Sequence, residues 1–210
     1  MIVDCIADLH GNYPALDGGD LLIVAGDLTA TDDIREYFTF FHWISNQPYR
    51  KRVVIAGNHD MLAQQEDCLL RMANGDFEYL KDEGTDFDGL KIWGSPWTLT
   101  FEGINPKCTA FTGTEDELAD KFMMIPHDTD ILITHGAPFG VLDKIPAGES
   151  VGCKYLKEAL VHCFRPDLWV FGHVHNAYGK ETYGEGTVCV NCSHVNEKYN
   201  PVNPPIRVVL

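Results

Sequence analysis

The sequence predicts an α/β protein that forms one domain over residues 1–210. Two observations support this prediction. Short apolar runs, typical of strands buried on both faces, alternate with segments whose apolar residues recur at helical spacing. At 210 residues and 45% hydrophobic composition, the chain is long enough to bury a core and short enough for a single domain.

The charge balance disfavours polyanionic partners. The 16 basic and 31 acidic residues give a net charge of -15, which repels nucleic-acid polymers and anionic membranes. Met1 leads into an apolar run without a basic leader, and no segment is apolar over the length of a bilayer. We therefore expect a cytoplasmic protein. The sequence does not indicate an oligomeric state.

The seven cysteines, an odd number at irregular spacing, do not form a disulfide framework, and we expect free thiols. Cys189 and Cys192 have the spacing of half a zinc site. They lie in an apolar strand-like run, however, where an odd separation puts the two thiols on opposite faces. We therefore interpret them as core residues.

Three early apolar runs are predicted as buried strands, and each ends at polar residues. The runs and the residues that follow them are 2–7 with Asp8 and His10, 21–25 with Asp27, and 53–56 with Asn58, His59 and Asp60. In α/β proteins the carboxyl ends of strands are where sites open. We therefore expect all three strands to place polar side chains at the carboxyl-terminal edge of a sheet.

Helical spacing predicts two packing helices in the first half of the chain. The first has candidate caps at Thr31 and Asp32. Its inward residues are predicted to be Ile34, Tyr37, Phe38, Phe41 and Ile44. The second runs from Asp60 to Arg71 and is predicted to place Leu62, Leu69 and Leu70 inward.

Further elements follow in the second half. Residues 90–93 form a predicted strand, which Gly94-Ser95-Pro96-Trp97 stops, and the loop from there through Phe111 is rich in glycine, proline and aromatic residues. Thr114 to Glu117 fits a capping box, so a helix begins there, with Leu118, Phe122 and Ile125 inward. Ser150 is predicted to cap another helix, with Cys153, Leu156, Leu160 and Phe164 inward.

The last strands complete the polar set. Residues 130–134 deliver His135, and residues 168–171 deliver His173 and His175, two imidazoles that point the same way from an extended backbone. Residues 187–191 and 206–210 are predicted as closing strands. Oxygen and imidazole ligands together suit manganese, iron or zinc, and seven such ligands suit two ions that share a carboxylate.

The strand-end motifs resemble those of the calcineurin-like metallophosphoesterases. That family's signature of Asp-x-His, Gly-Asp, Gly-Asn-His-Asp, a lone His and Gly-His-x-His is present in order from Asp8 to His175. The sequence is most similar to the small metallophosphoesterase-domain-containing members, whose pattern is echoed at residues 93–97, 134–138 and 203–206. The resemblance implies a four-layered α/β/β/α sandwich of two mixed sheets flanked by helices.

The resemblance also assigns ligands. It implies that one ion is held by Asp8, His10, Asp27 and His175, and a second by Asp27, Asn58, His135 and His173, so that Asp27 is the bridge. Gly136 and Gly172 are interpreted as positions where a side chain would crowd the metals. We expect manganese, with iron, zinc, nickel or cobalt as alternatives.

Such a centre predicts a mechanism. Two divalent ions about 4 Å apart lower the pKa of a shared water, hold the hydroxide in line with phosphorus and neutralise the phosphoryl oxygens. His59 is predicted to act as the general acid for the leaving group. Asp60 either orients His59 as a second catalytic residue or only serves the positive end of the helix that follows.

The substrate is predicted to be a small phosphodiester, with cyclic nucleotides as candidates. No arginine adjoins a metal motif, and a dianionic monoester would benefit from an arginine clamp more than a monoanionic diester would. Asn58, His59, Trp97 and Phe101 are the expected substrate contacts. One alternative is a phosphomonoesterase or nucleotidase at the same site. Another is a non-catalytic interaction module, although such a module usually loses ligands that are all present here.

Overall fold

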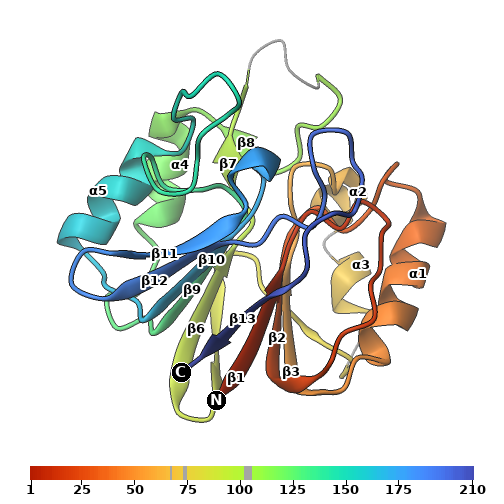
Figure 1. Ribbon diagram of the computed structural model, residues 1–210. Helices are drawn as coiled ribbons and strands as arrows, with labels where there is room; N and C mark the ends of the chain where they lie inside the picture. The colour runs from red at the N-terminus through yellow and green to blue at the C-terminus, as the bar shows by residue number, and fades with distance from the viewer. Residues whose placement is uncertain (67, 73–74, 102–105) are drawn as a thin grey trace.

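Two β-sheets pack face to face in the computed structural model, which describes residues 1–66, 68–72, 75–101 and 106–210 (Figure 1). The first sheet has the order β13 (Ile206–Val209), β1 (Ile2–Ile6), β2 (Gly19–Ala25), β3 (Tyr49–Ile55) and β4 (Glu78–Tyr79). The second has the order β11 (Gly179–Tyr183), β12 (Thr187–Asn191), β10 (Leu168–Phe171), β9 (Ile131–Thr134), β6 (Leu90–Ser95) and β5 (Glu83–Phe87).

Both sheets are mixed. Strands β1 to β4 are parallel and β13 is antiparallel to β1, whereas β6, β9, β10 and β12 are parallel between the antiparallel edge strands β5 and β11. A short parallel pair, β7 (Thr98–Leu99) with β8 (Thr112–Gly113), stands apart. The buried central strands carry the parallel pairing, as expected for strands covered on both faces.

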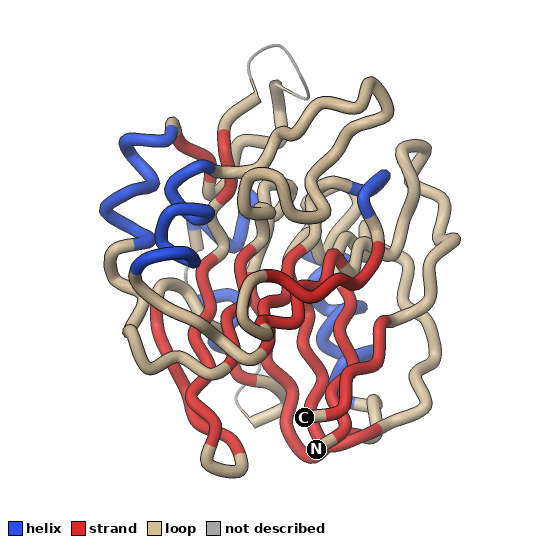
Figure 2. Tube along the Cα trace, turned by 60° about the vertical axis from the view of Figure 1, so that its left-hand side comes forward, coloured by secondary structure: helices blue, strands red, loops and turns tan. Residues whose placement is uncertain are grey.

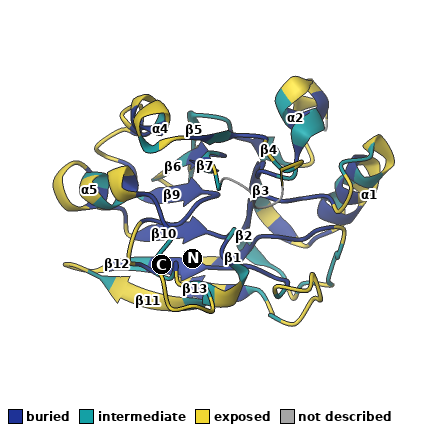
Figure 3. Cartoon of the chain, turned by 90° about the horizontal axis from the view of Figure 1, so that it is seen from above, coloured by how far each residue is buried: buried dark blue, intermediate teal, exposed yellow. Residues whose placement is uncertain are grey.

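Helices cover the outer face of each sheet, which gives the four layers that the sequence analysis predicted (Figures 1 and 3). On the first sheet lie α1 (Ile34–Ser45), α2 (Met61–Gln65) and α3 (Cys68–Arg71), and on the second lie α4 (Glu115–Phe122) and α5 (Lys154–His162). Among the described residues, no helix has the length and apolar character needed to cross a membrane.

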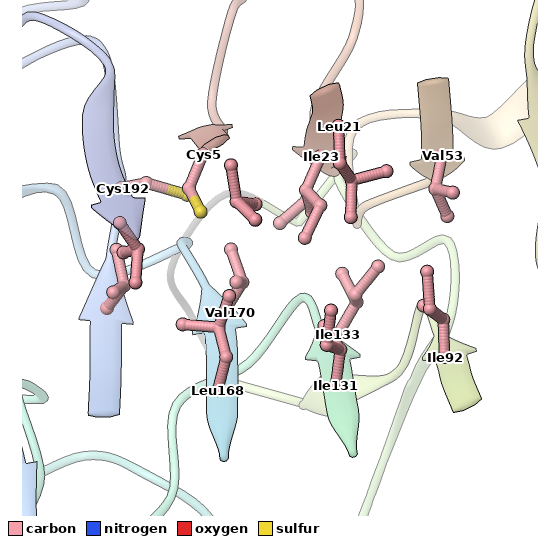
Figure 4. Close-up of a cluster of buried hydrophobic side chains, with 14 of the residues drawn as sticks. Cys5, Leu21, Ile23, Val53, Ile92, Ile131, Ile133, Leu168, Val170 and Cys192 are labelled. Atoms are coloured by element: carbon pink, nitrogen blue, oxygen red, sulfur yellow. The ribbon is translucent and has the colours of Figure 1, made fainter. Parts of the chain in front are cut away.

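The core between the sheets is built from alternate residues of the central strands. Cys5, Ile23 and Val53 of the first sheet face Ile133 and Val170 of the second (Figure 4). The intervening residues of the same strands face the helices. Each central strand is therefore apolar on both faces, which explains why these runs are almost continuous in the sequence.

The two thiols of the Cys189-x-x-Cys192 pattern lie in different cores, as their odd spacing predicts. Cys192 belongs to the cluster between the sheets, and Cys189 belongs to the cluster under α4 and α5. All seven cysteines are free thiols. Burial raises the pKa of Cys189 to about 12, so it is an inert core residue rather than a metal ligand.

Helix α1 turns a different face inward from the one predicted. Its buried residues are Tyr37, Phe40, Trp43 and Ile44, whereas Phe38 is 56% exposed. The cap is also one residue later, because the Asp33 side chain accepts a hydrogen bond from the backbone of Arg35. With aromatic residues at so many successive positions, spacing alone could not select the inward face.

Two further helix predictions need correction, and a long-range contact explains the second. The predicted helix from residue 60 to 71 is instead α2 and α3, with a break around Glu66, and residue 67 lies outside the described residues. Ser150 does not cap α5, which begins after Cys153. The first backbone N–H groups of α5, those of Lys154 and Tyr155, donate instead to the Glu115 carboxylate of α4 at 2.8 and 3.2 Å.

Strand β6 continues through Gly94 and Ser95, where the sequence predicted a stop. A β-carbon at Gly94 would lie 2.5 Å from the Leu80 side chain, so glycine is needed there for close packing rather than for a turn. The edge strands β5 and β11 were not predicted. They carry polar, partly exposed residues on both faces and lack the apolar run that marks the central strands.

A buried carboxylate ties three strands of the first sheet together. Asp4 of β1 is 4% exposed and accepts two hydrogen bonds from the Arg207 guanidinium of β13, at 2.7 and 2.8 Å. The Tyr49 hydroxyl of β3 donates to the same carboxylate. Because a buried charge is costly without partners, this arrangement specifies where β13 joins the sheet.

We expect Asp4→Ala to lower the free energy of unfolding by about 2 kcal/mol, because the buried Tyr49 hydroxyl loses its acceptor. Urea unfolding followed by circular dichroism measures this change. Glu185→Ala is the control, because it breaks an ion pair with Arg165 in which the two side chains are 80% and 64% exposed. It should change stability by less than about 0.5 kcal/mol. Equal effects of the two variants would contradict the role given to Asp4.

Candidate metal centre

The candidate site lies at the carboxyl ends of the central strands of both sheets. Loops gather there, at the end of the molecule opposite the two termini (Figure 2). The segments that leave β1, β2 and β3 meet those that leave β9 and β10. The two sheets thus bring five separate motifs of the sequence to one place.

Asp27 lies at the centre of this cluster. One of its carboxylate oxygens is 3.5 Å from His10 Nε2, and the other is 3.4 Å from His135 Nε2. Asp8 lies on one side, with His175 Nε2 3.5 Å from its carboxylate. Groups with metal-ligand spacing are Asp8, His10 and His175, then His10, Asp27 and His59, and then Asp27, His135 and His173.

The Asn58 amide completes the side on which His135 and His173 lie. Its nitrogen donates to the Cys108 carbonyl at 3.1 Å, so its oxygen is turned toward the cluster. That oxygen is 3.0 Å from His135 Nε2 and 2.9 Å from His173 Nδ1. The seven predicted ligands are therefore neighbours, and their roles as ligands remain a prediction.

Backbone carbonyls fix two of the imidazole tautomers. His135 Nδ1 donates to the Ala25 carbonyl at 2.9 Å, and His175 Nδ1 donates to the Asn196 carbonyl at 3.2 Å. Because a carbonyl only accepts, the Nε2 atom of each neutral ring keeps its lone pair, and that lone pair faces a carboxylate. Lone pairs and carboxylate oxygens that converge in this way fit divalent cations, so the donor set suits the two predicted ions.

Burial and the two carboxylates oppose each other in setting the imidazole pKa values. Burial lowers the pKa of His135, but Asp27 outweighs it and raises the pKa to about 9. Burial and the neighbouring His135 lower the pKa of His173 to about 3. A ligand imidazole must be neutral, so a cation that binds beside His135 takes the place of its proton.

The backbone at the site is held in an uncommon conformation. Asp8, His10, Asp27 and His173 all have positive φ, between 41° and 67°. Such angles are rare for residues other than glycine and are kept where the surroundings impose them. One such constraint is visible here, because the backbone N–H of His173 donates to both oxygens of Asp8, at 2.9 and 3.1 Å.

The prediction of two parallel imidazoles on an extended strand is therefore wrong. His173 has a φ of 67°, and His175 begins a 3-10 turn over His175–Ala177. The chain bends between the two residues, so His173 contacts Asn58 and His175 contacts Asp8. The motif spans the cluster rather than presenting two nitrogens to one point.

Two glycines leave room for the ligands. A β-carbon at Gly57 would lie 2.3 Å from an Asp27 carboxylate oxygen, and one at Gly172 would lie 2.3 Å from an Asp8 oxygen. Gly172 thus leaves room for a predicted ligand, whereas a β-carbon at Gly136 would meet the Thr98 side chain at 2.7 Å. Crowding of the metals themselves stays a prediction for both glycines.

His59, the predicted general acid, lies beside the cluster with its side chain 14% exposed. Its Nε2 is 4.0 Å from Asp27, and its Nδ1 is 3.4 Å from the Cys108 thiol. Its backbone N–H donates to the Asp27 carboxylate at 2.9 Å. Sequence reasoning did not single out Cys108, because it lies in a loop that carries none of the strand-end motifs.

Asp60 occupies the N-cap position of α2, and its part in catalysis stays a prediction. Its carboxylate is fully buried and accepts backbone hydrogen bonds from Gly57 at 2.8 Å and from Leu28 at 3.1 and 3.2 Å. It makes no side-chain cap to α2. Burial, and then the charge of Asp27, raise its pKa to about 7. Asp60 instead joins the loop that carries Asp27 to the loop that carries Asn58.

The model of the calcineurin-like phosphoesterase family matches residues 1–177 of the chain. The chain belongs to this family. Membership supports hydrolysis of phosphoesters at a binuclear metal centre, and the candidate ligands above are where that centre would form.

Several known proteins are similar to this one over most of the chain. Metallophosphoesterase domain-containing protein 1 of Homo sapiens is 34% identical, over 98% of this chain and 70% of its own length. A UPF0046 protein of Caenorhabditis elegans is 32% identical, over 96% of this chain and 78% of its own length. The solved structure of TT1561 of Thermus thermophilus shares the fold, with a TM-score of 0.67 and 14% identity over 90% of this chain and 88% of that one.

A cavity of about 600 Å³ opens at the cluster of candidate ligands of this calcineurin-like chain. Phe101 lines it and stacks on His173, with ring centroids 5.5 Å apart. Trp97 does not line it, because its indole N–H donates to Asp82 at 2.7 Å and Lys121 lies over the ring. Trp97 therefore anchors its loop to the rest of the protein through Asp82 and Lys121. Residues 102–105 of that loop lie outside the described residues.

A turn over residues 196–200 contributes two further residues to the cavity, Glu197 and Tyr199. The Tyr199 ring centroid lies 4.8 Å from that of His10 and 5.5 Å from that of His175. Sequence reasoning missed this turn. The signal that was available is its asparagine-rich composition before Pro201, which indicates a turn but not its place at a site.

We expect Gly57→Ala to weaken manganese binding at least tenfold, a change on the order of that seen when support around metal ligands is removed. The added methyl group would collide with the Asp27 carboxylate and displace it. Titration calorimetry of the metal-free protein measures the affinity, and circular dichroism checks the fold. In Gly179→Ala the new β-carbon has its nearest neighbour at 3.6 Å, so binding should stay unchanged. Equal affinities for the two variants would refute the interpretation of Gly57.

Proposed function

We propose that the chain is a phosphodiesterase that hydrolyses small phosphodiesters with two divalent ions, and that manganese is the preferred metal. The supporting observation is the composition of the cavity wall. The described residues that line the cavity include no lysine or arginine. A dianionic monoester would gain from such a cation, whereas two divalent ions suffice for the single charge of a diester.

The site residues have distinct parts in this reaction. When bound, the two ions activate water and neutralise charge on the phosphoryl group. Asp27 stands between the two halves of the cluster, where a shared carboxylate is required. His59 lines the cavity next to Asp27, where its ring can give a proton to the leaving oxygen.

The cavity also supports a compact substrate. A volume of about 600 Å³ suits a small organic phosphoester such as a cyclic nucleotide. Phe101 offers an aromatic face on the wall, although it already stacks on His173. Among the predicted substrate contacts, Asn58 and His59 lie closest to the cluster. Trp97 does not line the cavity and is not proposed as a substrate contact.

Two alternatives differ in what they require. A phosphomonoesterase or nucleotidase would use the same residues, and substrate preference alone separates it from our proposal. A non-catalytic module on the same fold requires no complete ligand set, yet all seven candidates and His59 lie together here. Hydrolysis is therefore the better supported function.

The cytoplasm remains the proposed location, and a small molecule remains the proposed partner. The free cysteines are in keeping with a reducing compartment. The net charge of -15 argues against nucleic-acid polymers and anionic membranes as partners.

The proposed preference predicts that the manganese-loaded protein turns over bis-p-nitrophenyl phosphate faster than p-nitrophenyl phosphate. Release of p-nitrophenol, compared as kcat/KM for the two substrates, is the measurement. A clear preference for the monoester would overturn the proposed phosphodiesterase activity and favour the phosphomonoesterase alternative.

The roles of His59 and Asp27 predict different defects. His59→Ala should keep its metals and lose turnover by about 100-fold, because only the proton donor is removed. Asp27→Asn should lose metal, because a carboxylate that touches both halves of the cluster is gone. Metal analysis and turnover are measured together, with His162→Ala as the control because that imidazole is exposed on α5. Full activity in either variant would refute the role assigned to that residue.

A further inference from the structure

The turn over residues 196–200 is fastened directly to a predicted metal ligand. The Asn196 carbonyl accepts from His175 Nδ1 at 3.2 Å. The Asn196 side-chain oxygen accepts the backbone N–H groups of Lys198 at 2.9 Å and Asn200 at 3.1 Å. These contacts give the turn one conformation relative to the cluster, so the side chains it carries have defined positions.

Alternate residues of this turn face the cavity. All three residues from Glu197 to Tyr199 are exposed, but Glu197 and Tyr199 line the cavity and Lys198 does not. Tyr199 has a φ of 59°, an angle that a tyrosine seldom adopts. Of these two neighbouring charged residues, the turn therefore places Glu197 and not Lys198 on the cavity wall.

Glu197 is the one charged residue of the described cavity wall outside the metal cluster and His59. Lys107, like Lys198, is a sequence neighbour of lining residues but is exposed and does not line the cavity. The sequence of residues 102–105, which lie outside the described part, adds no lysine or arginine. Apart from the predicted metal ions and their ligands, the charge on the described cavity wall is therefore the negative charge of Glu197.

Glu197 lines the same cavity as Asp27 and His175, so its charge acts on a substrate bound beside the cluster. At an effective dielectric constant of about 20, a like charge within about 10 Å changes binding by roughly tenfold. A second negative group on a substrate would meet this carboxylate with no cation on the described wall to offset it.

We propose that Glu197 is a specificity-determining residue that restricts the site to phosphodiesters whose ester groups carry no further negative charge. Substrates with neutral or cationic groups enter, and those with a second phosphate are disfavoured. The two metal ions then act on a single phosphoryl group. This inference rests on the proposed phosphodiesterase and adds the charge class of its substrates.

The test uses a matched pair of substrates and the full chain loaded with manganese. The first substrate is the p-nitrophenyl ester of thymidine 5′-phosphate, and the second is the same ester with an additional 3′-phosphate. Both release p-nitrophenol from the same linkage, so their kcat/KM ratio isolates the effect of the added charge. We expect the wild-type protein to prefer the first by about tenfold at low salt, and by less at higher salt.

Substitution of Glu197 should change that ratio. We expect Glu197→Lys to reduce the preference at least fivefold, with Glu197→Gln between it and wild type, roughly as the change in charge requires. Glu181→Lys is the control, because it makes the same change in net charge on exposed strand β11, away from the cavity wall. Its ratio should match wild type. Equal ratios in Glu197→Lys and Glu181→Lys would overturn the proposal.

A binding measurement separates this inference from the proposed function. Calorimetry compares the affinities of thymidine 5′-phosphate and thymidine 3′,5′-bisphosphate for each manganese-loaded variant. If no variant hydrolyses either ester, the phosphodiesterase is refuted, and the affinities still test Glu197. If hydrolysis occurs and both ratios are unaffected by Glu197→Lys, only the role of Glu197 fails.

Discussion

Two fully buried carboxylates, Asp8 and Asp27, are the constraint on which this architecture depends. A buried charge is costly unless hydrogen bonds and opposite charges surround it. Here backbone N–H groups of His173 and His59 donate to them, and the imidazoles of His175 and His135 lie beside oxygens that accept these bonds. Four residues of the cluster keep positive φ in this arrangement. The apolar packing of the sheets holds the loops in these positions and so offsets the cost of the site.

Support for the site comes from residues that touch no substrate. Asp60 joins the loops after β2 and β3 through backbone hydrogen bonds, and the Ala25 carbonyl sets the tautomer of His135. Gly57 and Gly172 leave space where any side chain would strike a carboxylate. Metal ligands depend on such neighbours for orientation and basicity. The motifs of the family therefore include structural residues beside chemical ones, and sequence order alone does not distinguish them.

Much of the fold and cluster follows from local sequence signals. Continuous apolar runs identified β1, β2, β3, β9 and β10, and polar residues directly after them marked the site. The predictions that failed concerned residues whose positions depend on contacts with residues far away in the sequence. Glu115 supplies the cap of α5 from another helix, and Gly94 lies within a strand because Leu80 packs against it. Glu197 lies on the cavity wall next to Asn196, whose carbonyl is hydrogen-bonded to the distant His175. No local pattern contains such information.

The pairing of β1 with β13 has a consequence for the order of events in folding. β1 lies inside its sheet, between β2 and β13, and the Ala7 backbone N–H donates to the Cys192 carbonyl. Asp8 receives its hydrogen bonds from His173, which is 165 residues further along the chain. During synthesis the ribosome releases these partners long after β1 itself, and contacts so distant in sequence form slowly. The nascent chain therefore cannot assemble its cation-binding pocket while only the strands of its first half have emerged.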